Sequence, residues 1–243
     1  MEIVRTSDVK VVVPAAGEGS RLEPLTADRP KGLVEIADRP LLAHVFETAV
    51  TAGATEIVVV VGERGHQIRE EFGSRIGSVP LTYVRQPRTR GLGDAVSWAR
   101  EQVDGPFMIL NGDNVFGDDI GHVVERIDEP RVDGILLLEQ STRSIARETG
   151  VVHIEDGLIT EIVEKPDDPP STLITTGCYV MPPAIFDALE LVRPSERQEI
   201  ELSEAVGLLL EAGYTVIPVL YEGARVNVNR PEDVATAERI IRG

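Results

Sequence analysis

The sequence of 243 residues is poor in cysteine and in aromatic side chains, and it contains no long apolar run. Its one cysteine, Cys178, excludes an internal disulfide and any zinc or iron–sulfur site built from several cysteines. No apolar stretch approaches the roughly 20 residues that a membrane-spanning helix needs. The opening residues, MEIVRTSDVK, show no basic and then apolar leader, so we expect a cytoplasmic protein.

Basic side chains are scarce too, and lysine above all. Lysine and arginine number 24 against 41 aspartates and glutamates, which gives a net charge of −17, and only Lys10, Lys31 and Lys165 are lysines. A surface this acidic repels nucleic acids and anionic membranes, so we expect neither as a partner. The acid-rich, lysine-poor composition favours a protein adapted to high salt over an ordinary acidic protein.

Strand-like and helix-like segments alternate in the first half of the chain. Strands are predicted at 9–16, 56–62, 81–86 and 107–113, and helices at 40–53, 64–72 and 92–103. This alternation predicts a parallel sheet with helices on both faces.

The second half is expected to be mixed and partly antiparallel. A hairpin is predicted from 151 to 163 around Asp156-Gly157, with strands at 134–140, 177–181 and 215–220 and helices at 183–191, 203–212 and from Pro231 onward. We therefore predict one α/β domain over residues 1–243, a Rossmann-like, mostly parallel sheet flanked by helices, with a partly antiparallel extension. Residues 1–115 form its first half, which is similar to nucleotide-binding folds.

Small residues crowd the loop that follows the first predicted strand. In this segment, Pro14–Leu22, a ligand could approach the backbone closely, and free N–H groups could hold phosphate oxygens. Arg21 adds a guanidinium that suits phosphate, and Lys31 adds a second cation. The segment is not a dinucleotide fingerprint, because Leu22 takes the third small position, nor a P-loop, which needs Gly-Lys-Ser/Thr. The candidate nucleotide-binding residues here are Ala15, Ala16, Gly17, Gly19, Ser20 and Arg21.

A second glycine-bearing loop follows the third predicted strand. Gln86 lies there, and its amide can pair with a nucleobase edge because it is both a donor and an acceptor. Taken alone, however, Gln86 is better explained as an ordinary polar loop residue. The neighbouring Arg85, Arg88 and Arg90 either guide a polyphosphate or balance nearby carboxylates, and we favour the second interpretation.

Two further positions suit charged ligands. Asp113 follows a buried strand at the edge where open α/β sheets bind ligands, so we interpret it as a Mg²⁺ ligand rather than a turn cap. Pro166 should hold Lys165 extended beside a pocket for a sugar phosphate, with Glu164 facing sugar hydroxyls. No nucleophile apparatus is evident, and we interpret Cys178 and Trp98 as packing residues.

The chain contains, in this order, the motifs A-A-G-x-G-S-R-L, P-L-T, P-K, Q-P with G-L-G, N-G-D-N, E-K-P, T-G and N-V-N-x-P-E-D. Taken together, these motifs resemble the sugar-1-phosphate nucleotidyltransferase family, especially archaeal glucose-1-phosphate uridylyltransferases and thymidylyltransferases. The resemblance spans nearly the whole chain. It implies that a nucleoside triphosphate and a sugar 1-phosphate give a nucleoside-diphosphate sugar and pyrophosphate, with Mg²⁺ as cofactor. UTP or dTTP and glucose 1-phosphate are the favoured substrates, and no covalent enzyme intermediate is needed.

The resemblance also implies a role for each motif residue. The triphosphate would be bound by Gly17, Ser20 and Arg21. Lys31 would contact the transferring phosphate, and Gln86 and Gly91 would contact the base. Magnesium would be bound by Asp113 and Asn227. In residues 116–243, mainly the sugar-phosphate-binding half, Lys165 would hold the phosphate, and the sugar would lie against Gly150, Glu164 and Gly177. A homo-oligomer is left open.

Some positions depart from the family pattern. Asn227 stands where relatives often have Asp, and Ala224 and Arg225 stand where an aromatic residue often precedes it. Thr149 and Thr175 replace a common Tyr and a common Asn. These departures leave the identity of the sugar open more than the class of reaction.

Three alternatives remain at this point. A silent regulatory paralogue should have lost a phosphate or metal residue, whereas Arg21, Lys31, Asp113 and Lys165 are all present. A nicotinamide-dependent oxidoreductase would use Glu63 for ribose. A transferase for phosphocholine or a similar alcohol phosphate would need an aromatic cage, whereas aromatic residues make up only 4% of the chain.

Overall fold

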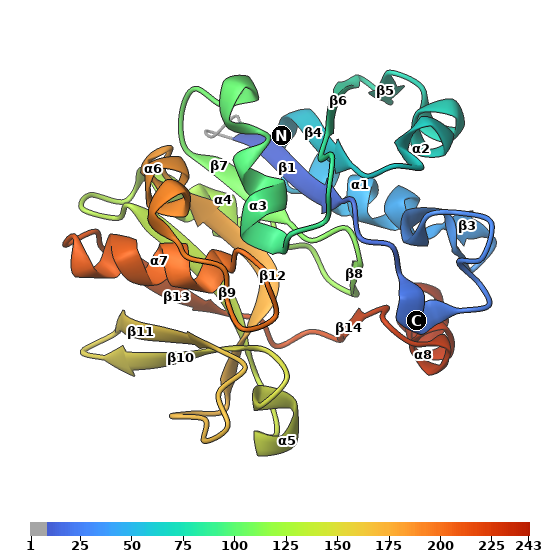
Figure 1. The fold of residues 1–243 in the computed structure, drawn as a ribbon. Helices are drawn as coiled ribbons and strands as arrows, with labels where there is room; N and C mark the ends of the chain where they lie inside the picture. Colours follow the sequence, from blue (N-terminus) through green and yellow to red (C-terminus); the bar gives the residue numbers. More distant parts are fainter. Residues whose placement is uncertain (1–8) are drawn as a thin grey trace, which may run out of the picture.

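A mixed sheet of ten strands forms the centre of the molecule in the computed structural model, which describes residues 9–243 (Figure 1). The strand order is β11-β10-β12-β7-β1-β4-β6-β5, and β12 also pairs with β9, which carries β13. Most of the opening segment, from which we expected no leader, lies outside the described residues. The predicted α/β class with a mostly parallel first half is confirmed.

The first half of the chain supplies the parallel strands. They are β1 (Val9–Ala15), β4 (Ala54–Val61), β6 (Val79–Arg85) and β7 (Phe107–Leu110). The helices between them are α1 (Leu41–Thr51), α2 (Gly65–Phe72) and α3 (Leu92–Ser97). The helix predicted at 92–103 is shorter than expected, because α3 ends at Ser97 and only a 3₁₀ turn, Arg100–Gln102, follows.

The buried centres of β1, β4 and β7 are apolar because helices cover both faces of the sheet there. Val11 and Val13 of β1 lie in a core cluster that includes side chains of α1, whereas Val12 lies in a second cluster with side chains of α3. The same alternation places successive valines of β4 in the two clusters. The parallel strands therefore hold their C-terminal ends, and the loops that follow them, in fixed positions.

The second half adds antiparallel strands. They are β9 (Gly134–Gln140), β10 (Gly150–Glu155), β11 (Leu158–Glu164) and β12 (Leu173–Met181), while β13 (Val216–Leu220) runs parallel to β9. The hairpin β10–β11 turns through Asp156 and Gly157, whose φ angles of 51° and 81° match the predicted primed turn. Because β12 pairs with β7, the second half joins the first in one sheet.

Helices and short elements complete the fold. The longer helices of the second half are α6 (Ala184–Leu191), α7 (Leu202–Glu211) and α8 (Pro231–Arg242). Elements that the sequence did not predict are β2 (Glu35–Ile36), β3 (Arg39–Pro40), β5 (Arg75–Ile76), β8 (Asn114–Phe116), α4 (His122–Glu125), α5 (Arg143–Ala146) and β14 (Arg225–Asn227).

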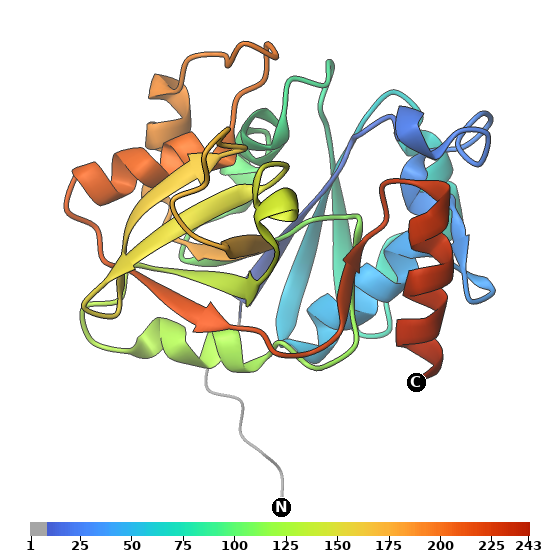
Figure 2. The same cartoon turned by 90° about the horizontal axis from the view of Figure 1, so that it is seen from below.

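Two of these unpredicted elements position the C-terminal motif. β14 pairs antiparallel with β8, so Asn227 lies opposite Asn114, just past the end of β7. From there α8 runs along one side of the molecule (Figure 2), and its Ala237 belongs to the same core cluster as Leu22 of the first loop. Within residues 9–243, no helix is long and apolar enough to cross a membrane.

Candidate active site

A cavity of about 500 Å³ lies among the loops that follow β1, β4 and β6. This volume is within the range of small-molecule sites. Its lining includes five of the predicted nucleotide-binding residues, namely Ala15, Ala16, Gly17, Ser20 and Gln86. Glu63, on which the oxidoreductase alternative depends, lines it as well, whereas Gly19, Arg21 and Gly91 do not. The structure therefore brings the first motif and Gln86 to one cavity.

Gly19 explains how the first motif turns toward Lys31. Its φ of 68° is left-handed, and it precedes the 3₁₀ turn Ser20–Leu22. A Cβ atom at this position would lie 2.9 Å from Cβ of Lys31 and 3.1 Å from Cγ2 of Thr26. Glycine is therefore required for both its backbone angle and its lack of a side chain, and it allows Lys31 to pack against the loop that follows β1.

Gln86 is held in place by α3. Its side chain is buried, and its Nε2 donates to Oδ2 of Asp94 at 2.6 Å. The same oxygen accepts a hydrogen bond from Nε1 of Trp98 at 3.3 Å. Our prediction that Trp98 is a packing residue is wrong, because the side chain is 44% exposed at the end of α3.

We expected the arginines around Gln86 to balance nearby carboxylates, and this prediction is wrong. Arg85, Arg88 and Arg90 are all exposed, and none of them forms an ion pair with any residue that the structure describes. Arg88 lines the cavity. Arg21 is exposed on the neighbouring loop and is likewise without an ion pair within residues 9–243. These four guanidinium groups are free to meet an anion.

Lys31 and Asp113 meet beyond the ends of β1 and β7. Nζ of Lys31 lies 2.7 Å from Oδ2 of Asp113 and donates to Oδ1 of Asn229 at 2.8 Å. The lysine and aspartate side chains are 13% and 25% exposed. The other carboxylate oxygen, Oδ1 of Asp113, is buried and has no hydrogen-bond partner among residues 9–243. This oxygen can accept a cation.

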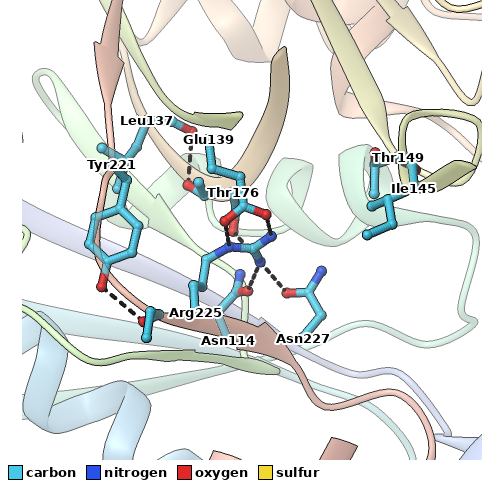
Figure 3. A network of polar contacts seen from close by, with 10 residues as sticks. Asn114, Leu137, Glu139, Ile145, Thr149, Thr176, Tyr221, Arg225 and Asn227 are labelled. Atoms are coloured by element: carbon cyan, nitrogen blue, oxygen red, sulfur yellow. Dashed lines mark hydrogen bonds and ion pairs between the residues drawn. The ribbon is translucent and has the colours of Figure 1, made fainter. Parts of the chain in front are cut away.

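Arg225 is the centre of a buried polar network (Figure 3). Its Nε and Nη2 donate to the two carboxylate oxygens of Glu139, at 2.9 and 2.5 Å, while its side chain is only 5% exposed. Nη1 donates to Oδ1 of Asn114 at 2.7 Å, to Oδ1 of Asn227 at 2.9 Å and to the carbonyl of Thr176 at 3.3 Å. The predicted metal ligand Asn227 is thus fixed by a cation from its own strand.

In the sequence, Arg225 stands out only as a departure from an aromatic pattern, and nothing indicates a role for Glu139. The two residues are 86 positions apart, on β14 and β9. A lone Arg and a lone Glu carry no local signal for such a pair. Only the fold brings them together.

Three of the four predicted sugar-side residues lie around the open end of the β10–β11 hairpin. Glu164 bridges two partners, since its Oε1 is 3.1 Å from Nζ of Lys165 and its Oε2 accepts from Oγ of Ser203 at 3.0 Å. A Cβ atom on Gly150 would lie 3.0 Å from Oγ1 of Thr175 and 3.3 Å from Oε2 of Glu164. Gly150, Glu164 and Lys165 therefore form one cluster.

Lys165 departs from the predicted extended backbone. Its φ is +47°, in the left-handed region, and its N–H donates to the carbonyl of Thr149 at 3.0 Å. This bond continues the pairing of β10 with β11 by one residue, which overrides the preference that Pro166 imposes on the residue before it.

Gly177 and Cys178 lie where β12 passes the end of β7. The register of β12 shifts between Thr175 and Tyr179, and Gly177 has a φ of 81°. A side chain at Gly177 would collide with the amide groups of Asn111 and Asn114. Cys178 is fully buried, and burial raises the pKa of its thiol to about 12, so the prediction of a core cysteine is confirmed.

The nucleotidyl transferase family model matches residues 10–237, which is nearly the whole chain. The chain belongs to this family. It is similar to the UTP–glucose-1-phosphate uridylyltransferase AglF of Haloferax volcanii, with 42% identity over 95% of this chain and 96% of that protein.

Solved structures agree with this assignment. A UDP-glucose pyrophosphorylase complexed with UDP-glucose is 25% identical, with a TM-score of 0.86 over 96% of this chain and 98% of that one. A UTP-bound UDP-glucose pyrophosphorylase from Acinetobacter baumannii is 26% identical, with a TM-score of 0.84 over 96% and 93% of the two chains. The resemblance drawn from the sequence motifs is confirmed.

Proposed function

We propose that this protein transfers a nucleotidyl group from UTP or dTTP to a hexose 1-phosphate, glucose 1-phosphate being favoured, and releases pyrophosphate. The observation that carries the proposal is the Lys31–Asp113 pair, with Nζ and Oδ2 2.7 Å apart. The pair joins the loop after β1, which lines the nucleotide cavity, to the turn after β7, which lies beside Gly177 of β12. A cation and a carboxylate thus stand between the nucleotide cavity and the second half of the chain.

In the proposed reaction, an oxygen of the sugar phosphate attacks the α-phosphorus of the triphosphate. A new phosphorus–oxygen bond forms, and the bond between the α-phosphorus and the oxygen that bridges to the β-phosphorus breaks. Arg21 would hold the triphosphate, and Lys31 would offset charge on the transferring phosphate. Catalysis then consists of positioning and charge neutralisation, for which no protein nucleophile is needed.

The residues present fit a magnesium ion. The buried oxygen Oδ1 of Asp113 has no partner within residues 9–243, and a carboxylate oxygen is a ligand that magnesium prefers. Oδ1 of Asn227 accepts from Arg225 but retains a second lone pair. Asp113 and Asn227 would hold the ion together with nucleotide phosphates. When bound, magnesium neutralises phosphate charge.

Lys165 would hold the phosphate of the sugar substrate, with Gly150, Glu164 and Gly177 against the sugar. Glu164 supports this role because its side chain is 20% exposed and already fixed by Ser203 and Lys165, so it can accept from a sugar hydroxyl without reordering. Residues 1–115 would then bind mainly the nucleotide, and residues 116–243 mainly the sugar phosphate. Nucleoside triphosphate as a substrate is consistent with work in the cytoplasm, which we also propose.

A pyrophosphate-release screen tests the proposal. Five nucleoside triphosphates are combined with several sugar 1-phosphates, at low salt and at molar salt, because we also propose that the acidic chain is adapted to high salt. We expect the fastest release with UTP or dTTP and glucose 1-phosphate. Preference for ATP or GTP would overturn the pyrimidine assignment, and no release with any pair would overturn the function.

A further inference from the structure

The orientation of the Gln86 amide is set by a carboxylate. Nε2 of Gln86 donates to Oδ2 of Asp94 at 2.6 Å. An ionised carboxylate can only accept hydrogen bonds, so it selects the nitrogen of the amide and not the oxygen. The backbone of Gln86 is fixed as well, because its N–H donates to the carbonyl of Val61 at 2.9 Å. The amide is therefore held in one of its two orientations.

The opposite end of the amide is left for a ligand. Gln86 lines the nucleotide cavity, and its Oε1 forms no hydrogen bond with any residue in the described part of the chain. Nor is Oε1 among the buried polar atoms that lack a partner. The cavity is thus offered the acceptor end of the Gln86 amide, while one of the two N–H donors on Nε2 is engaged by Asp94.

We propose that Asp94 is a positioning residue that determines base specificity. This role rests on the proposed function, in which Gln86 contacts the base. The Asp94 carboxylate holds the amide so that Oε1 of Gln86 faces the base as a hydrogen-bond acceptor. Uracil and thymine carry an N3–H that can donate to Oε1 of Gln86. Cytosine and adenine have a bare ring nitrogen at the corresponding position of their pairing edge, so two lone pairs would face each other. The site then selects a base with a ring N–H and rejects CTP.

Trp98 supports the carboxylate and also offers a probe. Its Nε1 donates to the same Oδ2 atom of Asp94 at 3.3 Å, which restrains the carboxylate from the other side. It is the one tryptophan of the chain and is 44% exposed. Its fluorescence should therefore respond when a base binds against Gln86, because one carboxylate joins the two side chains.

The test compares UTP with CTP in the wild type and in Asp94→Asn, using one sugar 1-phosphate. The amide at position 94 can accept from Nε2 of Gln86 or donate to its Oε1, so Gln86 can adopt either orientation. A hydrogen bond gained or lost here corresponds to a factor of about 10 to 100. We expect the ratio of kcat/KM for UTP over CTP to fall about 10-fold or more, mainly through the two KM values and with little change in kcat.

Two further variants separate orientation from simple damage to α3. Ser97→Ala removes the hydrogen bond from Ser97 Oγ to the backbone carbonyl of Asp94, 2.7 Å long, and leaves the carboxylate in place, so the ratio should stay at the wild-type value. In the double variant Gln86→Glu/Asp94→Asn, the amide at position 94 donates to the carboxylate at position 86, so donor and acceptor are exchanged between the two positions. The net charge is unchanged. Residue 86 again holds an acceptor toward the base, so the ratio should recover toward the wild-type value.

Binding is measured independently of turnover by titrating Trp98 fluorescence with UTP and with CTP. Tighter binding of UTP in the wild type, reduced in Asp94→Asn, supports the proposal even where no transfer occurs and the proposed function fails. An unchanged UTP-to-CTP ratio in Asp94→Asn overturns it, as does a wild type that uses or binds CTP as well as UTP. Should Asp94→Asn not fold by circular dichroism, Trp98→Phe, which removes only the second donor, must lower the kinetic ratio in the same direction.

Discussion

The cavity that we propose to bind the nucleotide and the Arg225 network are built on opposite principles. The cavity is lined by small residues and loop backbone at the ends of parallel strands, and the arginines around it have no ion pairs within residues 9–243. In the network, Arg225 is already bonded to Glu139, Asn114 and Asn227 before any substrate arrives. One region leaves its cations without ion pairs, as the proposed binding of a polyanion requires, and the other uses a cation to fix side chains.

The difference indicates where flexibility is tolerated. A triphosphate carries enough charge to order exposed arginines when it binds, at a cost in side-chain entropy. Apart from its phosphate, the sugar substrate offers only neutral hydroxyls, whose hydrogen bonds are weaker, so the groups that we propose to contact the sugar ring must be ordered in advance. The predictions below test this contrast, beginning with the residue at which the two regions meet.

The largest effect is expected for Asp113→Ala. The variant loses the proposed metal ligand and the partner of Lys31, so kcat should fall by about 10³-fold or more, while circular dichroism shows the wild-type fold. The matched control is Asp104→Ala, because Asp104 is 87% exposed beside Lys10 at the other end of β1. Turnover of Asp113→Ala within a few-fold of the control would remove Asp113 from the catalytic site.

Next comes the stability of the Arg225 network. Arg225→Met leaves Glu139 and Asn114 without their shared donor, and loss of one partner of a buried ion pair costs about 3–5 kcal/mol. Urea unfolding measures this loss. In Arg225→Met/Glu139→Leu the unpaired charge is gone, so much of the stability should return. If Arg225→Met unfolded at the same urea concentration as the wild type, the Arg225 network would not hold its side chains in place by stabilising the fold.

Lys165→Ala tests the sugar-phosphate side. Removing a charged hydrogen-bond donor should raise KM for the sugar 1-phosphate about 10- to 100-fold and leave KM for UTP nearly unchanged. Lys10→Ala is the control, since Lys10 bonds to the carbonyl of Gln102 away from the site. Equal changes in both KM values would show that Lys165 does not act on the sugar phosphate alone.

Asn227→Asp should have a smaller effect, on the metal. A second carboxylate adds charge to the proposed magnesium site, so the Mg²⁺ concentration for half-maximal rate should fall, by about 10-fold at most because Arg225 offsets part of the new charge. Mg²⁺ titration of the initial rate gives the value. If Asn227→Ala leaves the magnesium dependence unchanged, Asn227 is not a ligand.

Salt should act in opposite senses on stability and on substrate binding. A net charge of −17 opposes compaction, and at about 1 M salt the screening length falls to about 3 Å. We expect Tm to rise by several degrees between about 0.1 M and about 3 M potassium chloride, and KM for UTP to rise too, as the free arginines are screened. A Tm that did not change with salt would contradict the proposed high-salt adaptation.

The nucleotide side could be predicted because its signals are local. The first motif lies within one loop, β1, β4 and β7 contain apolar runs with clear ends, and Asp156-Gly157 specifies its own turn. Even there the helix after Gln86 was predicted too long, and the partnership of Trp98 with Asp94 was missed. An aromatic residue at helical spacing gives no sign of whether it packs or donates.

The sugar side could be predicted only as a set of motif residues, not as a structure. Strands β8 and β14 are three residues long, which is too short for periodicity to show. The bond from Arg225 to Asn114 joins residues 111 positions apart, and no local pattern encodes it. Lys165 adopts a left-handed backbone because a hairpin bond outweighs the preference before proline. Long-range pairing, and not local propensity, decides this half.

Transfer of label from the α-phosphate tests the central claim that both regions serve one reaction. UTP labelled at the α-phosphorus is incubated with glucose 1-phosphate, magnesium and the full chain, and the products are separated by chromatography. We predict label in UDP-glucose and none in pyrophosphate for the wild type, with Asp113→Ala giving no labelled sugar nucleotide. Label that stays in UTP for every sugar 1-phosphate tried, or that appears in free UMP without a sugar product, would contradict the account.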